Sequence, residues 1–242
     1  MTGSASPRAW SSDLAVDRTW ARWLSLAALA LVLIAVWQVP WLGWLVYPFR
    51  LFGTFIHELS HGLAAMVTGG EFLRFRVEPD LSGVATSAGG WRWVVASAGY
   101  VGSAVFGGLL LAIHARLLGA RALLIGLAVM FAVLCLLFLR NLFGVAAALG
   151  LTAALLLAGL KLPATARSWL VDILALQLIL DGYGSLFTVF LLSSSEQVRT
   201  DAHTMAAMSW LPASAWAVIW ALLSTFVLAL SVKIAVSGRR AP

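Results

Sequence analysis

Long apolar runs separated by short polar stretches dominate this chain of 242 residues. A helix needs about 20 apolar residues to cross the hydrocarbon core of a bilayer, and seven runs approach or reach that length. They lie at about Trp23–Val39, Tyr47–Val67, Trp93–Ile113, Leu123–Leu139, Leu142–Leu160, Trp169–Leu192 and Ala213–Val236. The pattern predicts an all-α integral membrane protein, a polytopic bundle of about seven transmembrane helices. The join at Arg140 and Asn141 is the weakest boundary, so Leu123 to Leu160 also fits one hairpin buried to different depths.

The longest polar interval inside the body of the chain runs from Gly69 to Arg92. Leu73 to Glu78 alternates with period two, the next five residues are rich in turn formers, and Val84 to Ser87 can form a returning strand. We therefore expect a small β-hairpin at about residues 70–92, within a single membrane domain at 23–237. Residues 1–22 are expected to form a polar N-terminal tail, and residues 238–242 a basic C-terminal tail.

Composition supports the membrane assignment. The chain is 62% hydrophobic and 11% charged, with a mean hydropathy of +0.95, which no ordinary soluble core absorbs. The net charge of +6 does not indicate nucleic-acid binding, because no basic cluster exceeds two adjacent residues and the arginines lie at segment ends. Lysines and arginines divide equally between the two sides of a seven-span topology; the three arginines before the first span favour a cytoplasmic N-terminus.

The motif with the clearest chemistry is His57-Glu58-Leu59-Ser60-His61, inside the second apolar run. On a helix, this HExxH spacing puts both imidazoles on one face, one turn apart, where they can bind a single Zn²⁺. Glu58 beside them is suited to act as general base toward a water that the metal acidifies. Such a short pattern also arises by chance, but ionisable groups in the middle of a membrane-length segment are costly unless paired, metal-bound or facing water. We therefore predict a zinc site at His57 and His61, with Glu58 catalytic.

A catalytic zinc usually has three protein ligands, so a further donor is expected. Depth in the membrane favours Asp181. At a rise of 1.5 Å per residue, Asp181 lies about 18 Å from the start of its span, and His57 lies about 15 Å from the start of its own span. Gln177, one turn earlier, is placed to orient that carboxylate. The alternatives are that Asp181 is an interior polar residue bonded to a Ser or Tyr, or that Asp201 is the ligand. Thr200 or Asp201 also suits the cap of a short interfacial helix.

Two further features have structural explanations. Asp172 is expected in the first turn of its span, where the helix dipole favours a carboxylate. Gly99, Ser103 and Gly107 fall at i, i+4 and i+8 of the third run, a stripe of small residues that lets another helix approach closely.

Several stretches resemble the M50 metallopeptidases of membranes, the site-2 protease class, and most closely their compact bacterial M50B-like branch. They are His57-Glu58-Leu59-Ser60-His61-Gly62, Thr68-Gly69-Gly70, Ala98-Gly99-Tyr100-Val101-Gly102, Arg140-Asn141-Leu142-Phe143-Gly144 and Thr200-Asp201-Ala202. The resemblance implies zinc-dependent cleavage of membrane-protein substrates in or near the bilayer, with His57 and His61 as ligands and Glu58 as base. A multi-pass location in a bacterial cytoplasmic membrane is expected with it.

The chain also departs from that class. Site-2 proteases usually carry an Asn and a Pro upstream of their Leu-Asp-Gly, whereas Leu170 to Leu180 contains neither, and there is no PDZ-like insertion. Substrate selection is therefore expected from the membrane domain, the hairpin or a partner protein. The hairpin has two open interpretations, an edge that holds an unwound peptide beside the metal and a simple connector.

Two other classes of protein also place histidines and carboxylates inside a membrane. A transporter or metal-handling protein should show internal repeats and broken helices, and the chain has no convincing repeat. A non-catalytic scaffold with a relic site is disfavoured by Glu58, because structural zinc needs no base. The expected partners are a membrane protein or peptide substrate and the lipid bilayer, without nucleic acid. The sequence specifies no oligomeric state.

Overall fold

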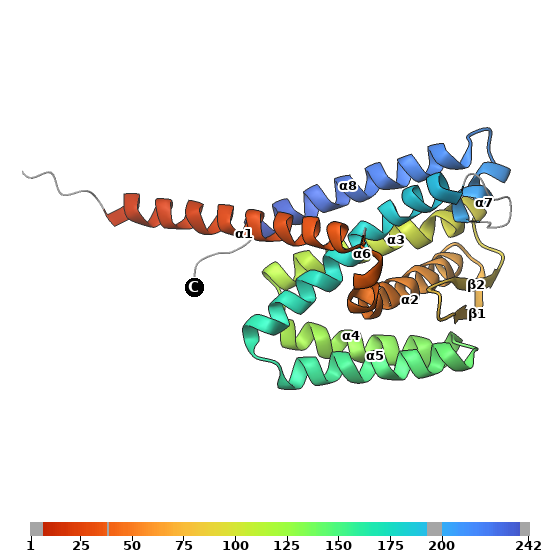
Figure 1. Cartoon of the computed structure of the whole chain (residues 1–242), viewed down its shortest axis with the longest axis horizontal. Helices are drawn as coiled ribbons and strands as arrows, with labels where there is room; N and C mark the ends of the chain where they lie inside the picture. The colour runs from red at the N-terminus through yellow and green to blue at the C-terminus, as the bar shows by residue number, and fades with distance from the viewer. Residues whose placement is uncertain (1–6, 38, 193–199, 238–242) are drawn as a thin grey trace, which may run out of the picture.

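Helices form nearly all of the computed structural model, which describes residues 7–37, 39–192 and 200–237 (Figure 1). In chain order the elements are α1 (Pro7–Trp37), a 3₁₀ turn (Pro40–Leu42), α2 (Gly43–Val67), β1 (Glu71–Val77), β2 (Gly83–Ala88), α3 (Arg92–Arg116), α4 (Ala120–Phe138), α5 (Leu142–Lys161), α6 (Ala164–Leu192), α7 (Asp201–Ala207) and α8 (Ala213–Ser237). Each of the seven apolar runs contains one long helix, which confirms the predicted all-α membrane fold. The C-terminal tail at 238–242 lies outside the described residues.

Five of the described helices are long and apolar enough to cross a membrane by length and composition. These are α1 from Trp20, α3, α4, α5 and α8. The other two long helices, α2 and α6, carry the polar residues on which the predicted site depends. Arg140 and Asn141 lie in the tight join between α4 and α5, which run antiparallel as a pair along one side of the bundle (Figure 1).

Helix α3 lies at the centre of the bundle and contacts α2, α6 and α8. Its small residues allow the close approach that their spacing predicts: a Cβ atom on Gly107 would lie 2.5 Å from the carbonyl oxygen of Ala175 in α6. On the opposite side of α2, aromatic rings fill the space against α4 and the hairpin. Phe55 packs 4.9 Å from Phe131 and 5.9 Å from Phe75, measured between ring centroids. Helix α2 therefore lies between α3 on one side and α4 with the hairpin on the other.

The position of Asp172 differs from the prediction. Helix α6 begins at Ala164, eight residues earlier, so Asp172 lies in the helix interior and the dipole of a first turn does not explain it. Its side chain is buried and pairs with Arg22 of α1 at 2.7 Å. The cost of burying this carboxylate is offset by a cation from another helix.

The predicted hairpin is present. Strands β1 and β2 pair antiparallel, from Glu71 opposite Ala88 to Val77 opposite Gly83, with an irregularity between Phe72 and Arg74. Phe72, Phe75 and Val77 are buried, and the polar residues between them are exposed. The tip is fastened to α2, because Thr54 Oγ1 donates to Leu81 O at 3.1 Å and Tyr47 OH donates to Pro79 O at 2.9 Å. These contacts lay the hairpin along α2.

Candidate metal centre

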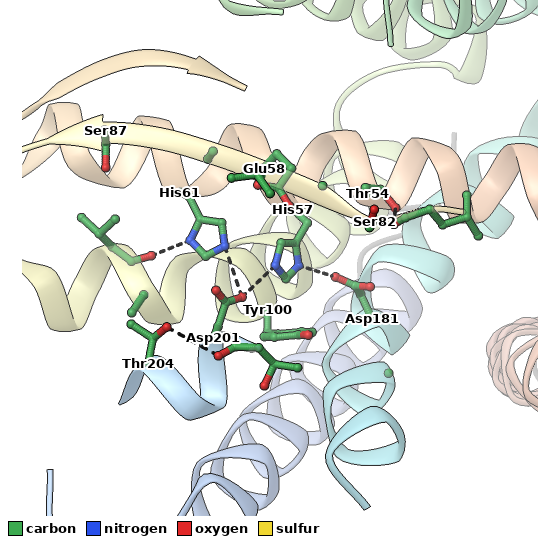
Figure 2. A pocket seen from close by; sticks show the side chains of 18 of the residues that line it. Thr54, His57, Glu58, His61, Ser82, Ser87, Tyr100, Asp181, Asp201 and Thr204 are labelled. Carbon is green, nitrogen blue, oxygen red and sulfur yellow. Dashed lines mark hydrogen bonds and ion pairs between the residues drawn. The ribbon is translucent and has the colours of Figure 1, made fainter. Parts of the chain in front are cut away.

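The two histidines of the HExxH motif lie on one face of α2, as their spacing predicts, and Figure 2 shows both rings directed into the same space. Their ring centroids are 4.9 Å apart. His57 and His61 are almost enclosed, with side-chain exposures of 13% and 11%. Two imidazoles so close together and shielded from solvent are suited to share one cation.

A carboxylate from a distant part of the chain completes the group. Asp201 is the first residue of α7, and its Oδ2 lies 3.0 Å from His57 Nε2 and 3.3 Å from His61 Nε2 (Figure 2). Among the described residues, these three side chains form the group able to hold a metal ion, with ligand atoms within 4.8 Å of one another. Tetrahedral zinc with bonds of about 2.0–2.1 Å spaces its ligands about 3.3 Å apart. The donors and their spacing therefore fit zinc.

The other nitrogen of each imidazole is already bonded. His57 Nδ1 lies 3.0 Å from Asp181 Oδ2, and His61 Nδ1 lies 2.6 Å from the Val95 carbonyl oxygen. A carbonyl oxygen can only accept, so His61 Nδ1 carries a proton, and the Asp181 carboxyl is placed to hold one on His57 Nδ1. The Nε2 atoms, which face Asp201, donate to it while they are protonated and are the atoms that bind a metal once they lose that proton. Metal-binding histidines are commonly oriented by such partners.

The geometry therefore favours Asp201 over Asp181 as the third donor, the reverse of the order that depth in the membrane suggested. Asp181 lies beside His57 but on the nitrogen directed away from His61 and Asp201. Gln177 is buried one turn before Asp181, and within the described part of the chain no hydrogen bond joins these two side chains. Thr200 caps α7, as predicted for this segment, and His203 is engaged in that cap.

Helix α7 is held in place mainly by apolar contacts. Ala202 and Met205 are buried against α3 and α8, with exposures of 0% and 1%. Burial disfavours ionisation of Asp201, but its hydrogen bonds with His57 and His61 outweigh that effect and hold the pKa of the carboxyl below its ordinary value. Asp201 is therefore an anion at neutral pH, as a metal ligand must be.

Two residues of α3 shape the space around His57 and were not singled out as site residues from the sequence. A Cβ atom on Gly99 would lie 2.1 Å from His57 Nε2, so glycine is needed for the imidazole to sit there. The ring of Tyr100 meets His57 edge to face, with centroids 4.4 Å apart, and stacks on Trp220 of α8. The family-like stretch Ala98–Gly102 was the available signal for both residues, and the interpretation of Gly99 as a helix-packing residue alone was incomplete.

Glu58 faces the hairpin from α2. Its side chain is buried, and a Cβ atom on Gly83 would lie 2.5 Å from Glu58 Oε1. The backbone amide of Ala85 is a hydrogen-bond donor to the same carboxylate. Strand β2 thus covers the base and holds it beside the two histidines (Figure 2).

A cavity of about 1140 Å³ opens onto these groups. Its walls come from α2, α3, α6, α7 and strand β2, and include Thr54, Ser82, Ala85, Ser87 and Tyr100. That volume exceeds the range of about 300–1,000 Å³ typical of small-molecule pockets. The space is sufficient for a segment of polypeptide.

Comparison with known proteins agrees with this chemistry. The family model for Peptidase M50B-like proteins matches residues 26–231, a range that includes the HExxH motif, Asp181 and Asp201. No curated protein and no solved structure matches the chain. Since the family model covers most of the chain, including every residue of the candidate metal centre, the protein belongs to the M50B-like family of membrane peptidases.

Proposed function

We propose that this protein is a zinc-dependent protease that hydrolyses peptide bonds of membrane proteins within or next to the bilayer. The observation that carries the proposal is the convergence of His57 Nε2, His61 Nε2 and Asp201 Oδ2 beside a buried carboxylate, Glu58. A structural zinc site has no use for such a carboxylate, whereas a hydrolase needs it as a base. We further propose that the chain is a multi-pass protein of a bacterial cytoplasmic membrane.

In this proposal His57, His61 and Asp201 hold the zinc ion. Asp181 and the Val95 carbonyl orient the two imidazoles through Nδ1. Bound zinc supplies a Lewis acid that polarises the scissile carbonyl and lowers the pKa of a water molecule. Asp181 is therefore proposed as a residue that supports a ligand and not as a ligand itself.

Glu58 moves the protons of the reaction. It takes a proton from the attacking water and gives it to the departing amine nitrogen, so the carboxylate is regenerated at the end of each turnover. Burial beneath β2 keeps bulk water away from the carboxylate and fixes its direction. Both properties favour proton transfer at a single position.

Strand β2 is the proposed support for the substrate. Phe75 and Val77 of β1 direct backbone groups away from β2, to Arg140 N and the Asn141 side chain. In an antiparallel ladder, two residues directly opposite each other either exchange backbone hydrogen bonds or both point their backbone groups away from the partner strand. Gly83 and Ala85, which lie opposite Val77 and Phe75, therefore direct their N–H and C=O groups away from β1. Ser87, two residues further along β2, has the same orientation. All three line the cavity. The Ala85 N–H is engaged by Glu58, so an extended peptide that adds to β2 as a third strand beside the metal centre would pair with the outward groups of Gly83 and Ser87 and with the Ala85 carbonyl.

A transmembrane helix must unwind before it can form that strand, because its backbone groups are otherwise satisfied internally. Substrates are therefore expected to carry Gly, Pro or Ser near the scissile bond, where a helix is easily opened. Selection then depends on how readily a segment unwinds as well as on its side chains.

Metal analysis together with a cleavage assay tests the proposal. The purified protein should contain about one zinc per chain, lose it when His57 and His61 are both replaced by Ala, and cleave a membrane substrate only when loaded. A chelator should stop cleavage, and added zinc should restore it. A protein that contains no zinc, or that cleaves equally well without it, would overturn the assignment.

A further inference from the structure

We propose that Asn141, in the join between α4 and α5, is a positioning residue for Glu58 and acts through the hairpin. The inference rests on the proposed proteolytic function, in which Glu58 is the base. Asn141 does not line the cavity, so any effect on the reaction must pass through other residues.

The side-chain amide of Asn141 forms the two hydrogen bonds with β1 that the backbone of a neighbouring strand would form. Its Nδ2 donates to Val77 O at 2.7 Å, and its Oδ1 accepts from Val77 N at 3.3 Å. Beside it, Arg140 N donates to Phe75 O at 3.0 Å, and Leu139 forms a parallel bridge with Phe75. The outer edge of β1 is thus closed by the α4–α5 join, which leaves β2 as the edge that faces the cavity.

A glycine makes room for this arrangement. A Cβ atom on Gly144, three residues later on the first turn of α5, would lie 2.4 Å from Asn141 Oδ1. Any larger residue there would displace the amide from Val77. Asn141 and Gly144 therefore act together as one structural unit at the start of α5.

Three contacts link Asn141 to the base. Asn141 holds the backbone of Val77, Val77 lies opposite Gly83 in the ladder, and Gly83 lies against Glu58. The hydrogen bonds that join the hairpin to α2, Thr54 to Leu81 and Tyr47 to Pro79, are at its tip. Asn141 therefore fixes the height of the strand pair above α2 at the level of Glu58.

Loss of the Asn141 side-chain amide leaves the backbone N–H and C=O of Val77 without partners in an apolar environment. Val77 is 0% exposed, so its N–H and C=O would be buried without partners unless the hairpin moved. Movement of the hairpin shifts Gly83 and the Ala85 amide away from Glu58. Because a misplacement of about 1 Å can lower a rate about 100-fold, we expect Asn141→Ala to reduce kcat by about 10- to 100-fold.

The experiment compares Asn141→Ala, Asn141→Asp and a matched control, Glu78→Ala, in the full-length protein reconstituted in liposomes. Glu78 is exposed, and its carboxylate is the side-chain neighbour of Asn141, at 3.5 Å from Nδ2. Glu78→Ala removes that contact and leaves both bonds to Val77. The probe is a fluorogenic peptide with an apolar transmembrane segment interrupted by Gly and Pro, and kcat is expressed per zinc-loaded molecule.

We expect Asn141→Ala to lower kcat with unchanged zinc content and to speed amide hydrogen exchange in residues 71–88. Asn141→Asp keeps the acceptor for Val77 N and should fall between wild type and Asn141→Ala, while Glu78→Ala should behave as wild type. Adding Gly83→Ala, which crowds Glu58 directly, should not multiply the loss, because both changes disturb the same contact. A merely structural role would lower zinc content or yield but leave kcat per loaded molecule unchanged.

Two results would overturn the inference while the proposed function stands: full kcat in Asn141→Ala, or a reduced kcat without faster exchange in the hairpin. If Asn141→Ala does not fold, Asn141→Asp decides by the same measures. A wild-type protein that binds no zinc and cleaves no substrate would instead overturn the proposed function, and this inference with it.

Discussion

Asp201 Oδ2 lies 3.0 Å from His57 Nε2, although 144 residues separate them in the chain. His57 is in the interior of the long helix α2, and Asp201 opens the seven-residue helix α7. The candidate metal centre therefore depends on how α7 docks on α3 and α8, and not only on the HExxH helix.

The first prediction separates the two aspartates. Asp201→Ala should empty the zinc site, because it removes one of three donors. Asp181→Ala should weaken zinc binding by about 10- to 100-fold, as expected for the loss of a group that orients a ligand. Zinc per protein is measured after dialysis at graded free zinc concentrations. If Asp181→Ala empties the site and Asp201→Ala does not, the ligand assignment proposed above is reversed.

A second prediction concerns the base. Glu58→Gln keeps the shape of the side chain but cannot take the proton, so cleavage should fall by about 10²–10⁴. Zinc content should stay at the wild-type level, since Glu58 is not among the three donors. Undiminished cleavage by this variant would refute the protease mechanism, and loss of zinc would show that Glu58 has a structural role.

Gly99 gives a third test of the geometry. An Ala side chain there would collide with His57 Nε2, so Gly99→Ala should displace the imidazole and sharply reduce zinc occupancy. Gly150→Ala in α5 is the control, because a Cβ atom at that position meets nothing within 4 Å. The control should retain zinc and be equally or more stable, since Ala favours a helix over Gly by about 1 kcal/mol. Equal zinc content in the two variants would show that the position of the imidazole does not depend on the space beside Gly99.

Proline substitutions test whether β2 is the substrate edge. Ser87→Pro removes an N–H that points away from β1, so it should raise KM by about two- to tenfold while the hairpin persists. Thr86→Pro removes a donor that pairs with β1 and should disrupt the hairpin itself. Proline at Phe75 or Val77 is less informative, because both side chains are in the core. An unchanged KM in Ser87→Pro would identify the hairpin as a connector.

The ion pair between α1 and α6 leads to a prediction about stability. Arg22→Ala leaves Asp172 buried without its cation, which typically costs about 3–5 kcal/mol. Asp172→Asn in the Arg22→Ala background should recover much of that loss, because the buried negative charge is removed. Thermal unfolding in detergent measures both variants. A single variant as stable as wild type would show that the pair contributes little to attaching α1.

The sequence alone determined most features that lie within a single helix or hairpin. Apolar run length predicted the seven long helices, period-two alternation predicted the hairpin, and HExxH spacing placed His57, Glu58 and His61 on one helix. Each of these follows from the periodicity of a single element, which the chain carries in full. The start of α6 was misplaced, because Asp172 looks like a helix-end residue until its partner Arg22 is seen.

The tertiary structure alone decided which distant groups meet. Depth along straight helices suggested Asp181 as third donor, but the docking of α7 brings Asp201 to the Nε2 atoms and leaves Asp181 on Nδ1 of His57. The same holds for Val95, Gly99 and Asn141, whose roles depend on which helix faces α2 and on how the α4–α5 join meets β1. Contacts between elements depend on the packing of the whole bundle, for which the spacing within one segment carries no signal.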